Sequence, residues 1–194
     1  VDWFGAFLQG KYDTEKFNLY GMGGISTIGY TYQDHFSVEK EVVEADAITS
    51  FQVKGGGRYN LDDRLSAFAN IGYVQKPPIL DNVIDYDGNV SQNPDNEKFT
   101  SFEIGGEYGS ELVAIKGSYY NTQWQDRNLT KSVSTGQGSS GDTDIIYLTG
   151  VNQSHSGVEI ESKVALHEMV DLDVAVSIGA VSYTHLTLPT KWTV

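Results

Sequence analysis

The sequence contains no cysteine, only 4 prolines, and only 13 lysines and arginines against 26 acidic residues. Without cysteine the chain can hold no disulfide framework and no thiolate metal site. Its net charge of −13 and its lack of a Lys/Arg cluster argue against nucleic-acid binding, because nothing would neutralise the phosphates. No run of about 18 apolar residues occurs, so the sequence predicts no transmembrane helix. No basic and apolar leader segment precedes the strand-like sequence that begins at Val1, so we expect the true N-terminus of an exported protein to lie outside this chain.

Stretches of alternating apolar and polar residues run along the whole chain. Within residues 51–60, Phe51 and Val53 fall on one face, and Lys54 and Arg58 fall on the other. Only an extended strand separates neighbouring residues in this way. We expect strands near residues 2–12, 17–32, 48–60, 65–76, 98–109, 112–126, 145–166 and 172–180.

The links between these strands alternate between short turns and long loops. The short links are 13–16, 61–64, 109–111 and 167–171, and the long links are 33–47, 77–97 and 127–144. Tight turns on one side of a membrane and long loops on the other are typical of a transmembrane β-barrel. The sequence therefore predicts an all-β fold, an antiparallel transmembrane β-barrel fragment of about eight strands in a bacterial outer membrane.

Three tyrosines support a membrane position. Tyr12, Tyr59 and Tyr108 each lie on the apolar face of a predicted strand, just before a short turn. A ring with an apolar body and a polar tip settles at the headgroup level, and barrels repeat such rings as a girdle. The strand from Phe4 to Tyr12 would cover about 20 Å of membrane normal when tilted by about 40°, close to the apolar band of about 25 Å in such barrels.

Two other architectures fit parts of this pattern. A soluble β-sandwich would use the apolar faces as an ordinary core, but its strands are usually shorter and it needs no alternation of link length. A complete eight-stranded barrel with an anchoring or adhesive role would close on an interior filled by its own side chains.

The polar faces of the predicted strands carry most of the candidate functional residues. A charged side chain is tolerable toward a wet or plugged lumen, whereas Lys or Arg on the lipid face would cost about 2–4 kcal/mol at the midplane. We expect these residues to pair across strands or with a plug, and a subset to contact a passing solute. The lumen-facing candidates are Lys54, Arg58, Glu103, Glu107, Glu159, Glu161 and Lys163.

Catalytic and metal-binding signals are weak. The sequence has no Gly-rich phosphate loop and no His-Glu-x-x-His pattern, so it predicts no enzyme, no catalytic residue and no cofactor. The segment Asp81–Asn89 is rich in oxygen ligands, but its spacing does not match a calcium-binding EF-hand loop. A solvated loop with a turn at Asp87-Gly88 is expected there instead, and no metal site.

Several segments between Gly55 and Gly179 form a recognisable series, namely Gly55–Leu61 with Leu65–Val74, Lys76–Ile84, Asn93–Gly105, Tyr119–Arg127 and His155–Glu161. In this order they resemble segments in the β-barrel of TonB-dependent outer-membrane receptors, especially those of Bacteroidetes-like bacteria. The first 54 residues fit that family only generically.

The resemblance implies energised uptake of a scarce, bulky solute such as a ferric chelate, a cobalamin-like cofactor, an oligosaccharide or a peptide. Such receptors have a barrel of about 22 strands, closed by a plug domain that contacts TonB. We therefore expect residues 1–180 to be a partial barrel domain, with the plug, TonB and closing strands outside this chain. The implied partners are outer-membrane lipid, the plug, TonB and a small-molecule or oligosaccharide ligand. Tyr86 and Trp124 could stack on such a ligand, and interfacial anchoring would explain Trp124 equally well.

The last residues do not continue the pattern. The string Val181-Ser-Tyr-Thr-His-Leu-Thr-Leu-Pro-Thr190 resembles a translated sequencing adapter, and the alternation from Leu172 to Ala180 stops before it. We interpret residues 181–194 as a non-native tail, so that His185 and Trp192 carry no function.

Overall fold

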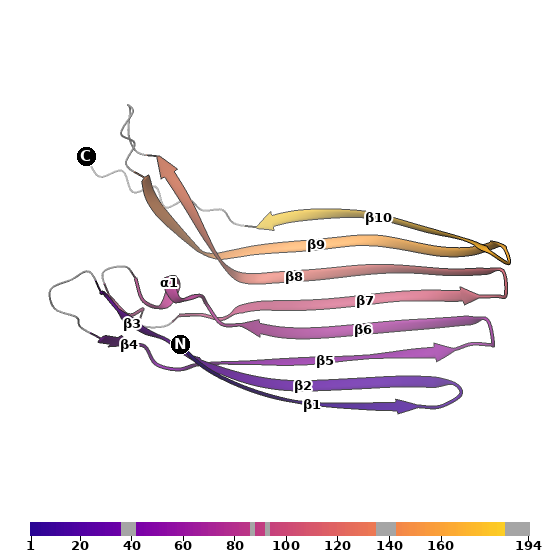
Figure 1. The fold of residues 1–194 in the computed structure, drawn as a ribbon, viewed down its shortest axis with the longest axis horizontal. Coiled ribbons are helices and arrows are strands. Elements are labelled where there is room, and N and C mark those ends of the chain that lie inside the picture. Colours follow the sequence, from indigo (N-terminus) through magenta and orange to yellow (C-terminus); the bar gives the residue numbers. More distant parts are fainter. Residues whose placement is uncertain (36–41, 86–87, 92–93, 135–142, 185–194) are drawn as a thin grey trace.

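The computed structural model describes residues 1–35, 42–85, 88–91, 94–134 and 143–184, and of these it describes only the backbone for 128–134, 143–149 and 184. One antiparallel sheet of eight long strands dominates the structure, and its strand order follows the chain (Figure 1). The strands are β1 (Asp2–Asp13), β2 (Phe17–Gly29), β5 (Ile48–Asn60), β6 (Leu65–Lys76), β7 (Glu97–Gly109), β8 (Val113–Ser134), β9 (Thr143–His167) and β10 (Val170–Thr184).

The sheet is a single open layer. Its strand order places β1 and β10 at opposite edges, so the closed eight-stranded barrel considered above is wrong. Large apolar side chains such as Leu8, Ile71 and Ile178 lie 81%, 68% and 75% exposed. A sandwich would bury these side chains against a second sheet, and the described strands form no such layer. The sandwich interpretation is therefore wrong as well, and the predicted antiparallel barrel segment of eight strands is confirmed.

The pairing register sorts side chains onto two faces. One face carries Phe51, Val53 and the other apolar members of the alternation, and we call it the apolar face. The opposite face carries Lys54 and Arg58, and we call it the charged face. The register confirms that Tyr12, Tyr59 and Tyr108 lie on the apolar face beside the short turns.

Three of the short turns share one hydrogen-bonding pattern. The side-chain oxygens of Thr14, Asp62 and Ser110 accept hydrogen bonds from the backbone N–H three residues later, at 2.8, 2.8 and 3.1 Å. In each case the backbone N–H of the same residue donates back to the carbonyl at that later position. Short polar side chains favour such turns because they replace backbone partners locally. All four short turns lie at the same end of the sheet (Figure 1).

The opposite end carries the long links between β2 and β5 and between β6 and β7, both of which are partly described. The first contains a small ribbon of β3 (Thr31–Gln33) and β4 (Val42–Glu44), and the second contains the short helix α1 (Leu80–Val83). These links pack on one another around the buried residues Tyr30, Val83 and Ile84. The Tyr30 hydroxyl donates to the Pro78 carbonyl at 2.8 Å, and the Ala45 N–H donates to the Tyr30 carbonyl at 3.0 Å.

Two predicted boundaries are wrong. Residues 127–144 were expected to form a loop, yet β8 and β9 continue into it, pairing from Leu129 with Leu148 to Ser134 with Thr143. A two-stranded ladder can extend beyond the rest of a sheet because half of the backbone groups of each strand pair with the other strand, and the outward-pointing half can bond to water outside the bilayer.

Strand β10 was expected to end at Ala180 but runs to Thr184, opposite Asn152. The interpretation of 181–194 as non-native stays a prediction, and residues 185–194, with His185 and Trp192, lie outside the described residues. Within the described part of the chain, no helix has the length and apolar character needed to cross a membrane.

Candidate functional site

The register brings all seven lumen-facing candidates to the charged face. Pairings between neighbouring strands connect Lys54 and Arg58 on β5, through β6, to Glu103 and Glu107 on β7. They continue through β8 to Glu159, Glu161 and Lys163 on β9. Alternation therefore placed these side chains on a common face, and whether they contact a plug or a solute stays a prediction.

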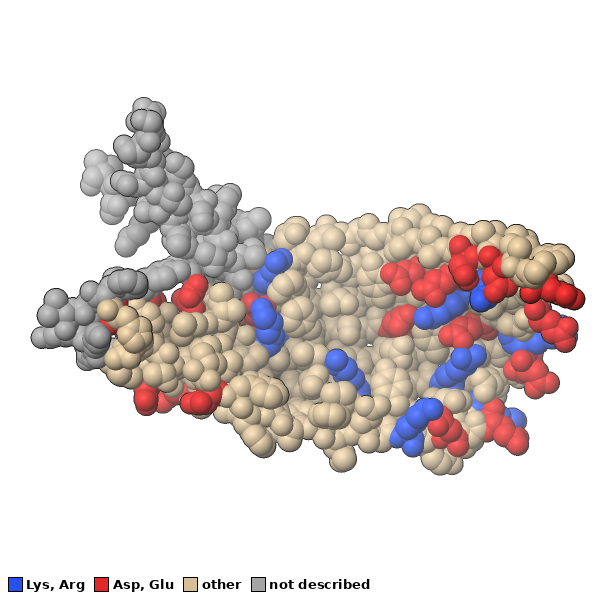
Figure 2. Space-filling view, in the orientation of Figure 1, with Lys and Arg blue, Asp and Glu red and all other residues tan. Residues whose placement is uncertain are grey.

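Charged side chains gather at the short-turn end of this face, and few occupy its middle (Figure 2). A hollow of about 1020 Å³ lies there, and among the seven candidates it is lined by Arg58, Glu107, Glu161 and Lys163. Arg58 pairs with Glu107 at 2.6 Å, and Lys163 pairs with Asp171 at 2.9 Å. Both pairs keep substantial solvent exposure, so water screens their attraction and neither is a main source of stability.

A row of polar contacts crosses the middle of the charged face. The Tyr20 hydroxyl donates to the Asn70 side-chain oxygen at 3.1 Å, and the Asn70 amide donates to Glu103 at 2.9 Å. The Tyr20 ring passes over Gly56, where a Cβ atom would lie 2.6 Å from the ring. Glu103 is thus held by neighbouring strands rather than presented as an isolated charge.

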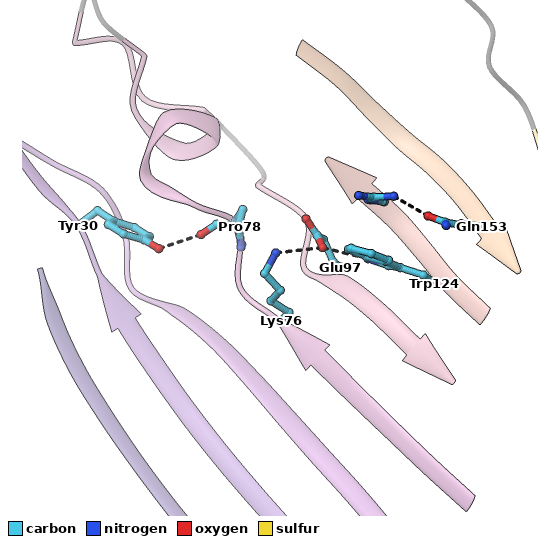
Figure 3. A network of polar contacts seen from close by, with 7 residues as sticks. Tyr30, Lys76, Pro78, Glu97, Trp124 and Gln153 are labelled. Carbon is cyan, nitrogen blue, oxygen red and sulfur yellow. Dashed lines mark hydrogen bonds and ion pairs between the residues drawn. The ribbon is translucent and has the colours of Figure 1, made fainter. Parts of the chain in front are cut away.

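A second polar network lies at the rim, where the sheet meets the long links (Figure 3). The Glu97 carboxylate is only 3% exposed, and it accepts hydrogen bonds from the Lys76 ammonium at 3.2 Å and the Trp124 indole at 2.9 Å. Beyond Trp124, the Arg127 guanidinium donates to the Gln153 side-chain oxygen. A buried carboxylate needs such donors because desolvation otherwise destabilises its charge. The network joins β6, β7, β8 and β9 on one face.

Trp124 belongs to this network and not to a membrane girdle. The register pairs it with Phe99 and Gln153 on the charged face. Its ring centroid lies 4.7 Å from that of Phe99, and the Arg127 guanidinium carbon lies 4.0 Å from the indole centroid. Interfacial anchoring in the lipid is therefore the wrong explanation of Trp124. Tyr86, the other aromatic expected to stack on a ligand, lies outside the described residues.

Sequence reasoning missed Lys76, Glu97, Arg127 and Gln153 as a connected group. Lys76 and Glu97 lie at the last and first positions of their strands, where alternation carries little information, and Arg127 fell in a predicted loop. The register pairs Lys76 directly with Glu97, so a correct strand pairing would have revealed their opposite charges.

In the loop that follows α1, the acidic side chain of Asp85 makes hydrogen bonds within the loop. The Asp85 carboxylate accepts hydrogen bonds from the Asn89 backbone N–H at 2.8 Å and from its side-chain amide at 2.9 Å. Gly88 adopts a φ of 82°, which a glycine tolerates without strain. Asp87, the other half of the predicted turn, lies outside the described residues. Among the described residues, no group of three His, Cys, Asp or Glu side chains could hold a metal ion.

The fold resembles those of known outer-membrane transporters. The copper transporter OprC matches with a TM-score of 0.68 and 17% identity over 92% of this chain and 29% of its own. The alcaligin outer-membrane receptor FauA of Bordetella pertussis matches with a TM-score of 0.63 and 16% identity over 93% of this chain and 30% of its own. The siderophore receptor PirA of Pseudomonas aeruginosa matches with a TM-score of 0.65 and 14% identity over 93% of this chain and 42% of its own.

At these identities the likeness shows the fold, and the chain spans less than half the length of each of the three structures. No curated protein matches the sequence. The family model described as "TonB dependent receptor-like, beta-barrel" matches residues 1–193, which confirms the resemblance stated above. Because members of this family are transporters of the outer membrane, the predicted location and the prediction that the chain is not an enzyme are confirmed. The chain belongs to the TonB-dependent receptor family.

Proposed function

We propose that these strands form part of a receptor that imports a scarce, bulky solute across the outer membrane with energy supplied through TonB. One observation carries the proposal, namely the single open sheet with an apolar face, a charged face and a barrel-family match along residues 1–193. A sheet of this kind is complete only when further strands pair with the edges of β1 and β10, because unpaired backbone groups cannot face lipid.

A metal chelate is the solute class with most support. Two of the similar structures are named for alcaligin and siderophore reception and one for copper transport. The rim network supports a polar, partly charged solute because Lys76, Glu97, Trp124 and Arg127 stand on the charged face where the long links begin. A cobalamin-like cofactor and an oligosaccharide remain the competing classes that the test below separates.

In this proposal the long links and the charged face act at different steps of transport. The links at 33–47 and 77–97, together with the hairpin formed where β8 and β9 extend beyond the sheet, capture the solute outside the cell. The seven candidates, from Lys54 to Lys163, then contact the plug or the passing solute inside the lumen. The hollow at the short-turn end lies farthest from capture, so its four candidates are the stronger plug contacts.

Uptake by cells tests the proposal. A strain lacking the gene that encodes this chain is compared with its parent for import of a radiolabelled ferric siderophore, radiolabelled cobalamin and a radiolabelled maltohexaose. We expect import of one probe to fall to the level of a strain without TonB, and a protonophore to abolish that import in the parent. Equal import of all three probes by the two strains would contradict the proposal.

A further inference from the structure

Two successive β-bulges, the first on β8 and the second on β9, lie where these strands leave the rest of the sheet. Trp124 pairs with Gln153, and the next pair is Arg127 with Val151. Between these two pairs β8 advances by three residues and β9 by only two, so β8 carries one extra residue. The next pair, Leu129 with Leu148, reverses this difference, so that the original register returns. Asp126 on β8 and Gly150 on β9 adopt left-handed φ values of 55° and 73°. Beyond this point the hairpin bends away from the sheet (Figure 1).

The first bulge changes the direction of Arg127. In a regular strand, residues three apart point to opposite faces, so Arg127 would lie on the apolar face if Trp124 lies on the charged face. The extra residue returns Arg127 to the side of Trp124, as bulges commonly re-aim a side chain. The guanidinium carbon accordingly lies 4.0 Å from the indole centroid, and the guanidinium donates to Gln153.

The same bulge separates two adjacent opposite charges. The Asp126 carboxylate pairs with Lys98 at 2.7 Å, and the Asp126 N–H donates to the Asn152 side chain at 3.2 Å. Asp126 is therefore neutralised by Lys98 and not by its neighbour Arg127. Within the part of the chain that the structure describes, no ion pair includes Arg127. Its cationic charge stands half-buried at the rim of the charged face.

We propose that Arg127 is a binding group for a carboxylate on the imported solute, an inference that rests on the transport function proposed above. A guanidinium offers five N–H donors in a planar fork that matches a carboxylate, and Gln153 accepts from only one nitrogen of Arg127. Stacking on Trp124 fixes the plane of the fork, so less conformational entropy is lost when an anion binds. The solute class is therefore an anionic one, such as a polycarboxylate chelate.

Calorimetric titration of the intact receptor, purified from outer membranes in detergent, tests the site directly. Citrate is the probe, and trimethyl citrate is its uncharged counterpart. We expect saturable citrate binding by the parent receptor and binding at least about 10-fold weaker in Arg127→Gln, because a hydrogen bond to a charged group contributes about 1.5–3 kcal/mol. Arg127→Lys should fall between them, since it keeps the charge without the fork.

The matched control is Arg64→Gln, which removes the same charge at the short-turn end and should bind citrate like the parent. Equal citrate binding by the parent and Arg127→Gln, or no saturable binding by the parent, would overturn the site. Trimethyl citrate binding that also depends on Arg127 would overturn its anionic specificity. Arg127→Gln cells that import at the parental rate overturn the site alone. Citrate binding that depends on Arg127, without TonB-dependent import of any probe, overturns the transport proposal alone.

Discussion

Asp62 shows how one short side chain specifies a hairpin of this sheet. Its carboxylate accepts hydrogen bonds from the backbone N–H groups of Arg64 and Leu65 at 2.7 and 2.8 Å. These bonds lower the pKa of the Asp62 carboxyl below its ordinary value, with Arg64 N–H contributing most. The contribution to turn stability is therefore complete at a pH above the ordinary carboxyl pKa and is lost as pH falls through the lowered value.

Replacing Asp62 should loosen the turn between β5 and β6. We expect Asp62→Ala to speed hydrogen exchange at the Leu65 amide, which loses its acceptor, while Asp62→Asn keeps an acceptor and has a smaller effect. On acidification, exchange at Leu65 relative to a distant strand amide should rise in the parent and stay constant in Asp62→Asn. Equal exchange of Leu65 in the parent and Asp62→Ala would show that the carboxylate does not hold the turn.

At the scale of strands, glycine positions decide how closely neighbouring side chains pack. Gly105 on β7 lies beneath the Phe68 ring, and a Cβ there would lie 2.5 Å from both that ring and the Gly117 carbonyl oxygen. Gly117 on the neighbouring β8 has no atom within 4 Å of its own ideal Cβ. The two glycines therefore differ in what an added methyl group would meet.

Gly105→Ala should destabilise the folded barrel by about 1–3 kcal/mol, the usual cost of overpacking. Gly117→Ala should leave stability unchanged or slightly higher, since Ala reduces the backbone freedom of the unfolded chain. Urea unfolding of the intact receptor in detergent, followed by the heat-sensitive mobility of folded barrels on gels, measures both. Equal midpoints for the two variants would mean that Phe68 and the β7–β8 pair can shift to accept the methyl group.

The sequence predicted the sheet well and the rim poorly, for a physical reason. Alternation is local, so Lys54, Glu103 and Glu161 could be assigned to one face without knowing which strands pair. The position of Arg127 depends on an extra residue in β8 whose left-handed backbone at Asp126 is compensated in β9 by Gly150. The buried contacts of Tyr30 with Val83 and Ile84 likewise join separate links. Such features follow from pairing between distant segments, which no local pattern records.

At the scale of the whole molecule, we expect the apolar face of the sheet to contact lipid and the charged face to contact the polar lumen. Ile104 on the apolar face is 57% exposed and stands four residues from Tyr108, which we expect at the headgroup level, about 10 Å away along the membrane normal. Thr122 lies on the charged face of the adjacent strand, β8. The same charge introduced at the two positions should therefore have different costs.

Ile104→Lys should lower barrel stability by about 2–4 kcal/mol because it places an ammonium near the middle of the apolar band. Thr122→Lys, which faces the lumen, should change it much less. The readout is the urea midpoint of the intact receptor in lipid vesicles, and detergent of matched thickness serves as a second medium. A larger loss for Thr122→Lys than for Ile104→Lys would reverse the assignment of the lipid-facing side.

The order of strands in the sheet also bears on how the chain folds. Every neighbour in the eight-stranded sheet is the next long strand in the sequence, so each pairing closes only the loop that joins two successive strands. The entropy lost on closing a loop grows slowly with loop length, and chains rich in local contacts fold fast. The sheet can therefore grow strand by strand from one edge, and each new edge is the template for the strand that follows it.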